Sequence, residues 1–393
     1  MTEGEDLLSC LLERLRREGR ITFADYMAEA LYHPRHGRYS RPSPPMGPEG
    51  DYITSPEVDP AFGRLIGRAV AEMAARLRTA AGGDDPFVVV EAGPGRGTLC
   101  RDLILGVQAD APDLGRSLRC VLVESSEALR REQRANLSAA GLLDRVEWIA
   151  WEDLLRRGPL RGCILANEFL DALPVHLVEW SGGSLREVYV EASPQGALRE
   201  VLGDASCAEV AGYFDAVGAR LEEGQRAEVN LEALRWVRQA ASLLRSGYAV
   251  IIDYGHEARD LFSERHFAGT LLGYRRHALV VDPLAAPGEH DLTSHVDFTS
   301  VLREARRAGF QEWGATSQRR LLVALGLVQM IADLSGESTG EAVRRRFALH
   351  ALMSPAGMGE TFKVLVLGRN APLEGLRCLK DPFRDPEWAA RRG

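Results

Sequence analysis

The 393-residue sequence lacks paired cysteines and an excess of positive charge. Its six cysteines form no C-x-x-C pair, which argues for reduced thiols and against a structural zinc site. We therefore predict a cytoplasmic protein without metal ligands. Acidic residues exceed basic ones by 56 to 48, and the net charge of -8 gives no overall field that would attract nucleic acid.

Long apolar runs and targeting segments are also missing. The longest apolar stretch, residues 321–332, is interrupted by Gly326 and Gln329 and is too short for a bilayer of about 30 Å. The chain begins Met-Thr-Glu-Gly-Glu-Asp, whereas a secretory signal or a mitochondrial presequence would be basic there. We expect neither a membrane span nor a targeting segment.

Strand and helix patterns alternate from residue 87 onward. Such alternation predicts an α/β fold with a mostly parallel, Rossmann-like sheet that is covered on both faces. The expected strands lie at 87–91, 119–123, 146–149, 162–166, 248–252, 310–316 and 361–367. The helices between them include 97–108, 126–140, 230–245 and 297–308.

Additions surround this core. Residues 1–80 form a predicted helical N-terminal extension with a lid-like loop, rich in proline and glycine, at 33–60. The main domain would span 81–393, with insertions at about 175–225 and 318–358. The first begins as a β-hairpin at 175–202, and the second forms a helical cap. Such insertions shape either a substrate site or an interface.

A glycine-rich turn follows the first strand of the main domain. Gly93, Gly95 and Gly97 separate Glu91 from an apolar helical pattern, so the backbone can lie against a ligand at the helix N-terminus. The G-P-G-x-G spacing differs from the G-x-G-x-x-G of dinucleotide enzymes and from a P-loop. The turn predicts a small polar ligand without a pyrophosphate.

Carboxylates also end the next strands, and the strand ends of a parallel sheet share one edge. Glu124 is placed to accept hydrogen bonds from both hydroxyls of a ribose, and Asp153 from an adenine amino group. Together with the glycine turn, they predict S-adenosylmethionine as the cofactor. Structural alternatives stay open for both: Glu124 as a charge at a helix N-terminus, and Asp153 as a helix cap.

The motif after the fourth strand reads Asn167-Glu168-Phe-Leu-Asp171-Ala-Leu-Pro174 and would lie beside the methyl donor. Glu168 and Asp171 would share a face if the segment is helical. They are the predicted contacts of the methyl acceptor. The alternative is an N-cap with acidic residues in the first helical turn.

Ordered motifs run through most of the chain. The N-terminal ones are Phe23-x-x-Tyr26-Met27, Leu31-Tyr32-His-Pro34, Gly37-Arg-Tyr39 and Gly50-Asp51-Tyr52-Ile-Thr54-Ser55-Pro56-Glu57. The central ones are Glu91-x-Gly-Pro-Gly-Arg-Gly-Thr-Leu99 and the segment 167–174. The C-terminal ones are Ile252-Asp253-Tyr254-Gly255, Gly269-Thr270-Leu271, Asp282-Pro283-Leu284, Pro287-Gly288, Asp291-Leu-Thr293-Ser-His295-Val-Asp297-Phe298 and Met358-Gly359-Glu360-x-Phe362-Lys363. With these motifs the chain resembles the MidA-like methyltransferases, a family that includes the mitochondrial complex I assembly-factor protein arginine methyltransferase.

The resemblance implies a class I, S-adenosylmethionine-dependent methyltransferase fold with a protein arginine as the acceptor. It also implies that the N-terminal loop folds over the cofactor. Departures from the family pattern at Val58-Asp-Pro60, Arg64 and Asn230 bear on the acceptor more than on the fold. The predicted cofactor-binding residues are Tyr52, Thr54, Ser55, Glu57, Glu91, Gly93, Gly95, Gly97, Thr98, Glu124, Asp153 and Asn167.

Methyl transfer from a sulfonium is an in-line displacement that depends on proximity and electrostatics. We predict that Glu168, with Asp171 as its partner, holds a guanidinium bidentately and helps to remove its proton. Asp253, His295 and Asp297 are further candidates on the acceptor side. His295 would be either a base near neutral pH or a hydrogen-bonded structural residue.

Other functions stay open. A small-molecule methyltransferase would use the same cofactor cleft with a closed apolar acceptor pocket in place of an open acidic groove. A non-catalytic assembly factor or chaperone would keep the fold but has no physical need for the glycines together with Glu124 and Glu168. The identity of the acceptor and a homodimeric state are likewise undecided.

Overall fold

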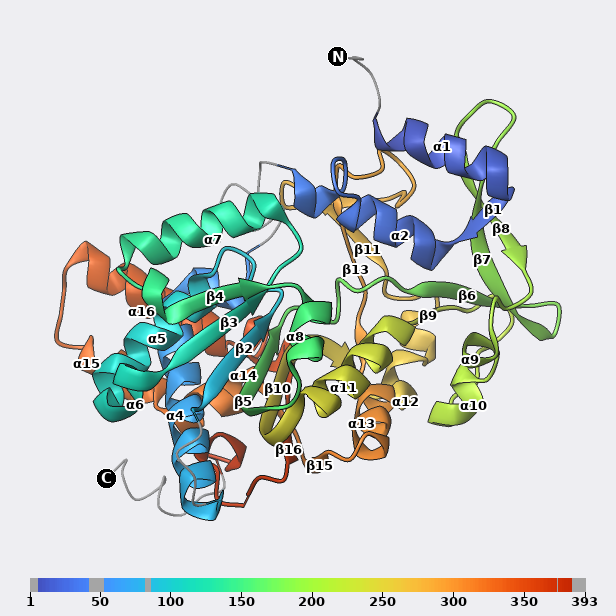
Figure 1. The fold of residues 1–393 in the computed structure, drawn as a ribbon. Coiled ribbons are helices and arrows are strands. Elements are labelled where there is room, and N and C mark those ends of the chain that lie inside the picture. Colours follow the sequence, from blue (N-terminus) through green and yellow to red (C-terminus); the bar gives the residue numbers. More distant parts are fainter. Residues whose placement is uncertain (1–5, 42–52, 82–85, 373, 384–393) are drawn as a thin grey trace.

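A mostly parallel sheet forms the centre of the computed structural model, which describes residues 6–41, 53–81, 86–372 and 374–383 (Figure 1). The strand order is β15-β16-β10-β5-β2-β3-β4, with the short β14 beside β10. Strands β10, β5, β2, β3 and β4 are parallel, whereas β16 and β15 run antiparallel to their neighbours. The strands are β2 (Val88–Ala92), β3 (Arg119–Val123), β4 (Val146–Ile149), β5 (Leu160–Asn167), β10 (Leu244–His256), β14 (Val296–Asp297), β15 (Gln311–Ser317) and β16 (Phe362–Arg369).

The strand order reverses next to β2. The chain adds β3 and β4 on one side of β2, and then β5 and β10 on the other. In open α/β sheets, ligands bind at such a switch point, outside the carboxyl ends of the strands. Ala92 at the end of β2 lies opposite both Val123 and Ala166. This register brings Gly93, Glu124 and the end of β5 to one edge.

Helices cover both faces of the sheet because its strands are apolar on both sides. Val89 and Val250 contact one layer, and Val90 and Ile251 contact the other. The first layer contains α4 (Ala61–Ala81), α5 (Thr98–Asp110), α7 (Glu127–Ala139), α14 (Gln318–Leu325), α15 (Leu327–Asp333) and α16 (Gly340–Met353). The second contains α8 (Trp151–Arg157), α11 (Leu231–Leu243) and α13 (Phe298–Arg307).

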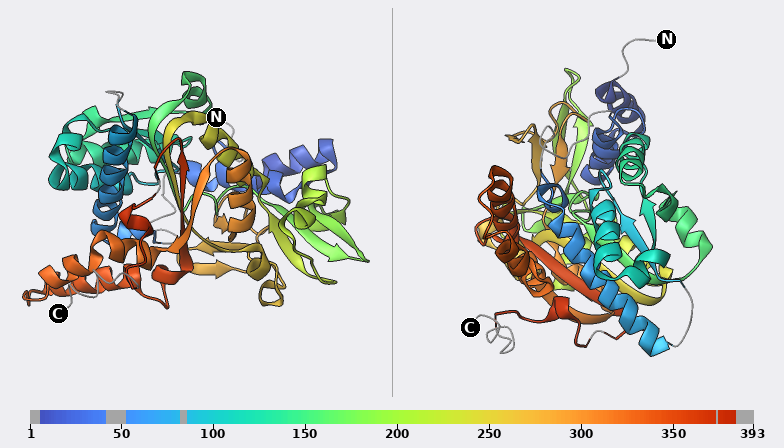
Figure 2. Two further views of the ribbon diagram at one scale, coloured as in Figure 1. Left: turned by 90° about the horizontal axis from the view of Figure 1, so that it is seen from below. Right: turned by 90° about the vertical axis from the view of Figure 1, so that its left-hand side faces the viewer.

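An antiparallel sheet of order β1-β7-β6-β9, with β8 on β7, lies at the opposite end of the molecule from α15 and α16 (Figures 1 and 2). Strand β1 pairs with β7, where Ile21 lies opposite Val190. Helices α1 and α2 pack on one side of this sheet, and α9, α10 and α12 pack on the other. The elements are β1 (Arg20–Thr22), β6 (His176–Ser181), β7 (Ser184–Ala192), β8 (Leu198–Gly203), β9 (Arg226–Val229), α1 (Leu7–Glu18), α2 (Phe23–Tyr32), α9 (Ala208–Ala211), α10 (Tyr213–Val217) and α12 (Ala258–Leu261).

Smaller elements connect these layers. A third sheet has the order β12-β11-β13. Its strands are β11 (Leu272–Arg275), β12 (Ala278–Val280) and β13 (Asp291–Thr293). The short helices are α3 (Ser55–Val58), α6 (Pro112–Ser117) and α17 (Met358–Thr361), and the 3-10 turns are η1 (Arg38–Ser40), η2 (Leu143–Arg145), η3 (Glu264–His266) and η4 (Arg377–Leu379).

The structure confirms the mostly parallel sheet and the hairpin, and it adds detail to the N-terminal extension and the helical cap. The N-terminal extension is not purely helical, because β1 joins the inserted sheet. The helical cap expected within 318–358 consists of several helices, and α14 ends at Gly326, whose φ of 110° favours glycine. Of the lid-like loop, residues 42–52 lie outside the described residues, and its two ends form η1 and α3. None of the helices in the described ranges has the length and apolar character of a membrane span.

Candidate functional site

The turn between β2 and α5 requires glycine at both ends. Gly93 has a φ of 63°, and a Cβ there would lie 2.7 Å from the ring of Phe169. Gly97 precedes α5 with a φ of 78°, and its Cβ would lie 3.3 Å from Gln133. Other residues rarely adopt this left-handed conformation. Because these positions carry no side chain, the backbone of the turn stays accessible to a ligand at the switch point.

Glu124 follows β3 as a buried carboxyl group. It accepts hydrogen bonds from the Ser126 amide (2.8 Å) and the Gln133 side chain (3.3 Å), and Gln133 also donates to the Gly95 carbonyl (2.7 Å). Burial raises the pKa of Glu124 to about 7, against these hydrogen bonds. The carboxyl group is thus tied to the glycine turn, and its bond to Ser126, the N-cap of α7, also fits the structural alternative.

A cavity of about 420 Å³ occupies this edge of the sheet, a volume typical of small-molecule sites. The aromatic residues of its wall pack on one another, with ring centroids 5.9 Å apart for Trp151 and Trp236 and 5.4 Å apart for Phe169 and Trp236. The cavity therefore combines an apolar wall with convergent carboxylates. Of the predicted residues, it brings together Gly93, Gly95, Glu124 and Glu168.

The end of the N-terminal loop packs against the glycine turn. Glu57 accepts a hydrogen bond from Thr98 Oγ1 and forms an ion pair with Arg96 (3.4 Å). The Ser55 amide donates to Glu168 (3.0 Å). Tyr52 lies outside the described residues. A small hollow beside the cavity is lined by the predicted residues Thr54, Glu57, Glu91, Gly93, Gly95, Thr98, Asn167 and Glu168.

Glu168 has a left-handed backbone conformation at the end of β5, with a φ of 50°. Such a conformation costs a non-glycine residue on the order of 1–3 kcal/mol and clusters at functional sites. Its Oε1 accepts hydrogen bonds from the Ser55 amide (3.0 Å) and the Asn167 side chain (3.2 Å). Burial, aided by the Asp171 carboxylate, raises the pKa of Glu168 to about 8. Burial raises the pKa of Glu91 to about 8 as well.

Residues 168–174 form turns, so neither a shared helix face nor a helix N-cap describes this motif. Asp253 holds the turn because its Oδ2 accepts hydrogen bonds from the backbone amides of residues 169–171 at 2.9–3.3 Å. Asp171 accepts hydrogen bonds from the Thr293 hydroxyl (2.9 Å) and the Tyr254 hydroxyl. Burial raises the pKa of both aspartates. Asp253, predicted on the acceptor side, thus positions the turn that carries Glu168 and Asp171.

The predicted adenine contact of Asp153 does not fit its position. Asp153 lies in the first turn of α8, pairs with Arg156 and has about half of its side chain exposed (53%). It is absent from the described lining of the cavity, whereas Trp151 and Glu152 from the same strand end line it. The helix-end alternative fits Asp153 better, because acidic residues are favourable in the first helical turn.

Asp297 and His295 also lie apart from the described cavity lining. Asp297 is the N-cap of α13 and accepts hydrogen bonds from the amides of Thr299 and Ser300, which gives it a structural role. The His295 ring contacts Tyr254 with centroids 5.4 Å apart. Burial lowers the pKa of His295 to about 4, so the ring is neutral and weakly basic at pH 7.

Several cavity residues were not predicted. Tyr32 and Tyr39 line it with stacked rings 5.4 Å apart, and the Tyr39 hydroxyl donates to Asp291 (2.8 Å). Both tyrosines belong to the N-terminal sequence motifs, and this membership is the signal that could have identified them as cavity residues. Trp236 lies on α11, far along the chain, and only the tertiary fold brings it to the cavity.

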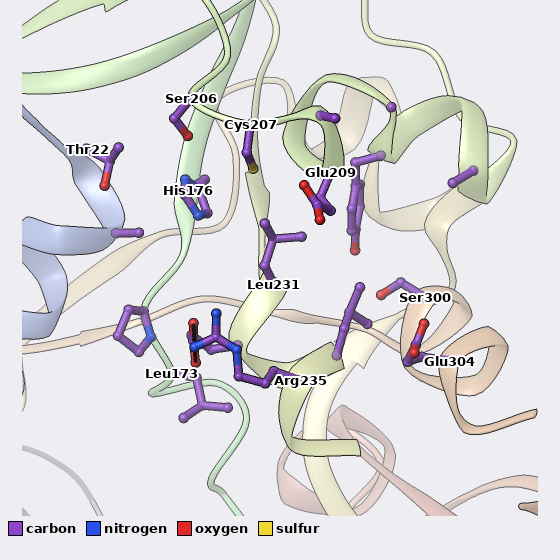
Figure 3. A pocket seen from close by; sticks show the side chains of 18 of the residues that line it. Thr22, Leu173, His176, Ser206, Cys207, Glu209, Leu231, Arg235, Ser300 and Glu304 are labelled. Carbon is purple, nitrogen blue, oxygen red and sulfur yellow. Dashed lines mark hydrogen bonds and ion pairs between the residues drawn. The ribbon is translucent and has the colours of Figure 1, made fainter. Parts of the chain in front are cut away.

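A second hollow of about 1000 Å³ lies between α2, the inserted segment and α11 and α13 (Figure 3). His176 of β6 and Cys207 line it, which shows that the insertion shapes a cavity. It shares Tyr32, Leu173, Glu232 and Arg235 with the first cavity. None of the residues predicted for cofactor binding or catalysis is among its described lining residues.

Known methyltransferases are similar to this chain over most of its length. A family model described as "Putative S-adenosyl-L-methionine-dependent methyltransferase" matches residues 65–316. The chain is 33% identical to the bovine protein arginine methyltransferase NDUFAF7, mitochondrial, over 394 residues, which cover 94% of this chain and 85% of the relative. It is 31% identical to the human protein of the same name over 409 residues, which cover 98% and 88%.

Solved structures from Burkholderia thailandensis have the same fold. One is a superfamily member bound to S-adenosyl-homocysteine, with a TM-score of 0.83 and 31% sequence identity over 93% of this chain and 92% of the other. A native structure from that species has a TM-score of 0.82 at 31% identity and covers 95% of this chain and 93% of the other.

Proposed function

Because the chain belongs to this family of S-adenosyl-L-methionine-dependent methyltransferases, we propose that it methylates an arginine side chain of a protein. The fold is that of a class I methyltransferase, and the cofactor is S-adenosyl-L-methionine. The arginine acceptor is the finer part of the proposal. The names of the relatives support it. So do three carboxyl side chains beside the cofactor cleft, Glu168, Asp171 and Asp253, which together form the buried acidic group.

The cleft suits this cofactor. Gly93 leaves the space that a Cβ would fill, so a ligand can lie against the backbone. Glu124 offers a carboxylate to ribose hydroxyls, and Trp151 and Trp236 offer an apolar wall to a base. A volume of about 420 Å³ is adequate for a nucleoside with a short side chain.

The buried acidic group is the observation that carries the acceptor proposal. Glu168, Asp171 and Asp253 are each buried or nearly so, and each has a raised pKa. Among the residues that the structure describes, no lysine or arginine forms an ion pair with any of them. Buried carboxyl groups without a cationic partner favour a cationic ligand, because a guanidinium would compensate the charge that burial penalises.

Glu168 has a carboxylate oxygen that can accept a hydrogen bond from such a ligand. Both hydrogen bonds that it accepts from described residues end on Oε1, which leaves Oε2 available to a guanidinium N–H. A bound guanidinium would lower the pKa of Glu168 from about 8 and ionise it. The carboxylate would then orient the acceptor nitrogen and take up its proton after transfer. When bound, the cofactor supplies the electrophilic methyl group on its sulfonium.

The test uses purified enzyme, methyl-labelled cofactor and lysate from a strain that lacks the gene. Calorimetry first establishes that the protein binds S-adenosyl-L-methionine. We expect label in a discrete protein band, and mass spectrometry of that band should locate the methyl group on arginine. The Glu168→Gln variant should bind the cofactor and leave the band unlabelled.

Three outcomes would favour the other functions. Label confined to the small-molecule fraction would indicate a small-molecule methyltransferase and refute the protein acceptor. Cofactor binding without any labelled product, or no cofactor binding at all, would favour a non-catalytic assembly factor.

A further inference from the structure

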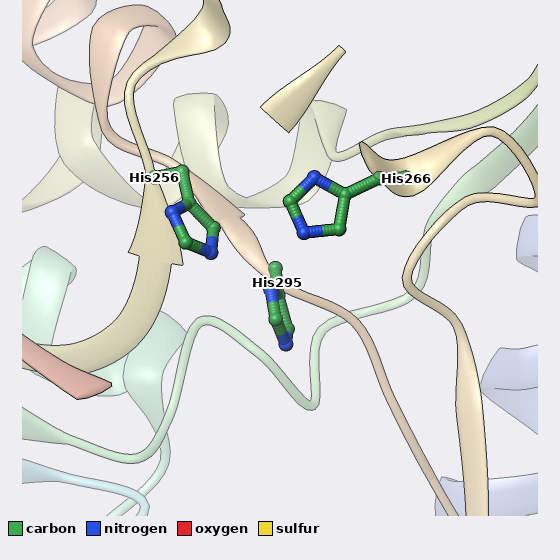
Figure 4. Close-up of side chains that lie close together, drawn as sticks. All are labelled: His256, His266 and His295. Carbon is green, nitrogen blue, oxygen red and sulfur yellow. The ribbon is translucent and has the colours of Figure 1, made fainter. Parts of the chain in front are cut away.

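Three histidines from separate segments of the chain lie close together (Figure 4). His256 ends β10, His266 ends the turn η3, and His295 lies between β13 and β14. One ligand nitrogen from each ring lies within 4.8 Å of the others. The Nδ1 atom of His295 is buried and has no hydrogen-bond partner among the described residues.

The fold holds the backbone of all three histidines in place. Strands β10 and β14 pair in parallel, with His256 opposite Asp297 and Gly255 opposite Val296, so His295 follows the end of β10 closely. The buried Glu228 accepts hydrogen bonds from the Thr270 amide (2.8 Å) and the Thr270 hydroxyl (2.8 Å). The Thr270 hydroxyl accepts in turn from the His295 amide (3.0 Å). This chain of hydrogen bonds connects the segment after His266 to His295.

The distances between the rings agree with ligation of one ion. A tetrahedral zinc ion with Zn–N bonds of about 2.0–2.1 Å places the centres of its imidazole ligands about 5 Å apart. The ring centroids of His256 and His266 are 5.1 Å apart, those of His256 and His295 are 5.4 Å apart, and those of His266 and His295 are 5.9 Å apart. In such a site the ligand nitrogens lie about 3.3 Å apart, so the three rings would move closer together when the ion binds.

Asp260 lies beside two of the three rings and gives one of them, His266, the outer hydrogen bond that metal-binding histidines use. Its backbone carbonyl lies 3.1 Å from His266 Nδ1, and its carboxylate lies 3.9 Å from His256 Nδ1. A carbonyl that accepts from Nδ1–H fixes the tautomer in which Nε2 carries the free lone pair.

We propose that His256, His266 and His295 bind one divalent transition-metal ion, with zinc as the reference ion. Three imidazoles with an open fourth position are a donor set suited to zinc, copper, nickel and cobalt. All three rings are partly exposed, which gives an ion a route of entry. The site is independent of the identity of the methyl acceptor.

The ion would stabilise the backbone next to Asp171 of the buried acidic group. Tyr254 precedes His256 by two residues, and its ring contacts His295. Its hydroxyl donates to Asp171, as does the hydroxyl of Thr293. Binding would therefore join the ends of β10 and β14 to the η3 segment and stabilise the folded state by linkage.

The test measures zinc binding to the full chain after removal of metal with a chelator. We expect one zinc ion per chain by equilibrium dialysis with elemental analysis, and a higher thermal midpoint as zinc is added. His266→Gln and His256→Gln should each weaken binding by about 100-fold or more, since loss of an outer contact alone costs 10–100-fold. His350→Gln alters an exposed histidine on α16 and should bind zinc as the wild type does.

A second readout covers a variant that does not fold. Cobalt(II) added to the wild-type chain should give the intense visible bands of a four-coordinate ion, and zinc should displace it. Equal zinc affinity in the wild type and the folded His266→Gln variant would overturn the proposal. So would the weak bands of octahedral cobalt, or the same loss of affinity in the His350→Gln control.

Discussion

Replacement of Glu168 by glutamine should remove most methyl transfer while it stabilises the protein at alkaline pH. Glutamine has the same shape, and its carbonyl oxygen can still accept the hydrogen bonds from Ser55 and Asn167. What it loses is the negative charge that would orient a guanidinium. Loss of one preorganised electrostatic contact typically lowers the rate by about 10²–10³-fold, or about 2.7–4 kcal/mol. We expect kcat/KM to fall by this factor while the Kd for the cofactor changes little.

Although the Glu168→Gln variant should be less active than the wild type, its folded state should be more stable at alkaline pH. The pKa of Glu168 is raised from 4.5 to about 8 in the folded state, so the folded state holds the proton more tightly than the unfolded chain does. The wild type therefore loses stability as pH rises from 4.5 to 8, by up to about 1.4 kcal/mol per pH unit. Glutamine does not titrate, so the free energy of unfolding of the variant should not fall for this reason.

Urea denaturation at pH 5 and pH 8.5 would measure the change in stability, and steady-state kinetics with calorimetry would measure the change in function. The expected pattern is a large loss of kcat/KM together with a higher free energy of unfolding at pH 8.5. Full activity in the variant would refute the catalytic role. Equal destabilisation at both pH values would show that Glu168 is needed for folding instead.

Three further substitutions test other parts of the site. Gly93→Ala should lower stability by about 1–3 kcal/mol and weaken cofactor binding, because its Cβ would meet Phe169 at 2.7 Å in a left-handed conformation; unchanged calorimetric affinity would contradict the fit of the turn to its ligand. Glu91→Gln should reduce the fall in unfolding free energy between pH 5 and pH 8, because burial raises the pKa of Glu91 to about 8, and denaturation curves that keep the wild-type pH dependence would oppose this. Asp153→Asn should leave kcat and KM within about twofold of the wild-type values, since the Asp153–Arg156 pair is exposed. A raised KM for the cofactor would instead support the predicted contact of Asp153 with adenine.

Local sequence patterns predicted the core of the site. Residues 119–123 form the expected strand, because an apolar run between helical patterns is a local signal. Gly93 and Glu124 meet at the cavity because strand ends of a parallel sheet share an edge, which topology alone guarantees. Glu168 reaches the same cavity by this rule, although its segment is not helical.

The remaining features depend on contacts between distant parts of the chain. The turn at 168–174 is held by Asp253, more than eighty residues away, so local acid spacing suggested a helix instead. Strand β1 is too short to be recognised without its partner β7. His256, His266 and His295 have no motif spacing in the sequence, so only the tertiary fold brings them together.

Hydrolysis of the labelled protein to amino acids tests the central claim most directly. Protein labelled by the wild-type enzyme should release its labelled methyl group as N-methylated arginine, and the Glu168→Gln reaction should release none above background. Label recovered on another amino acid, or only in small molecules, would contradict a guanidinium acceptor beside Glu168.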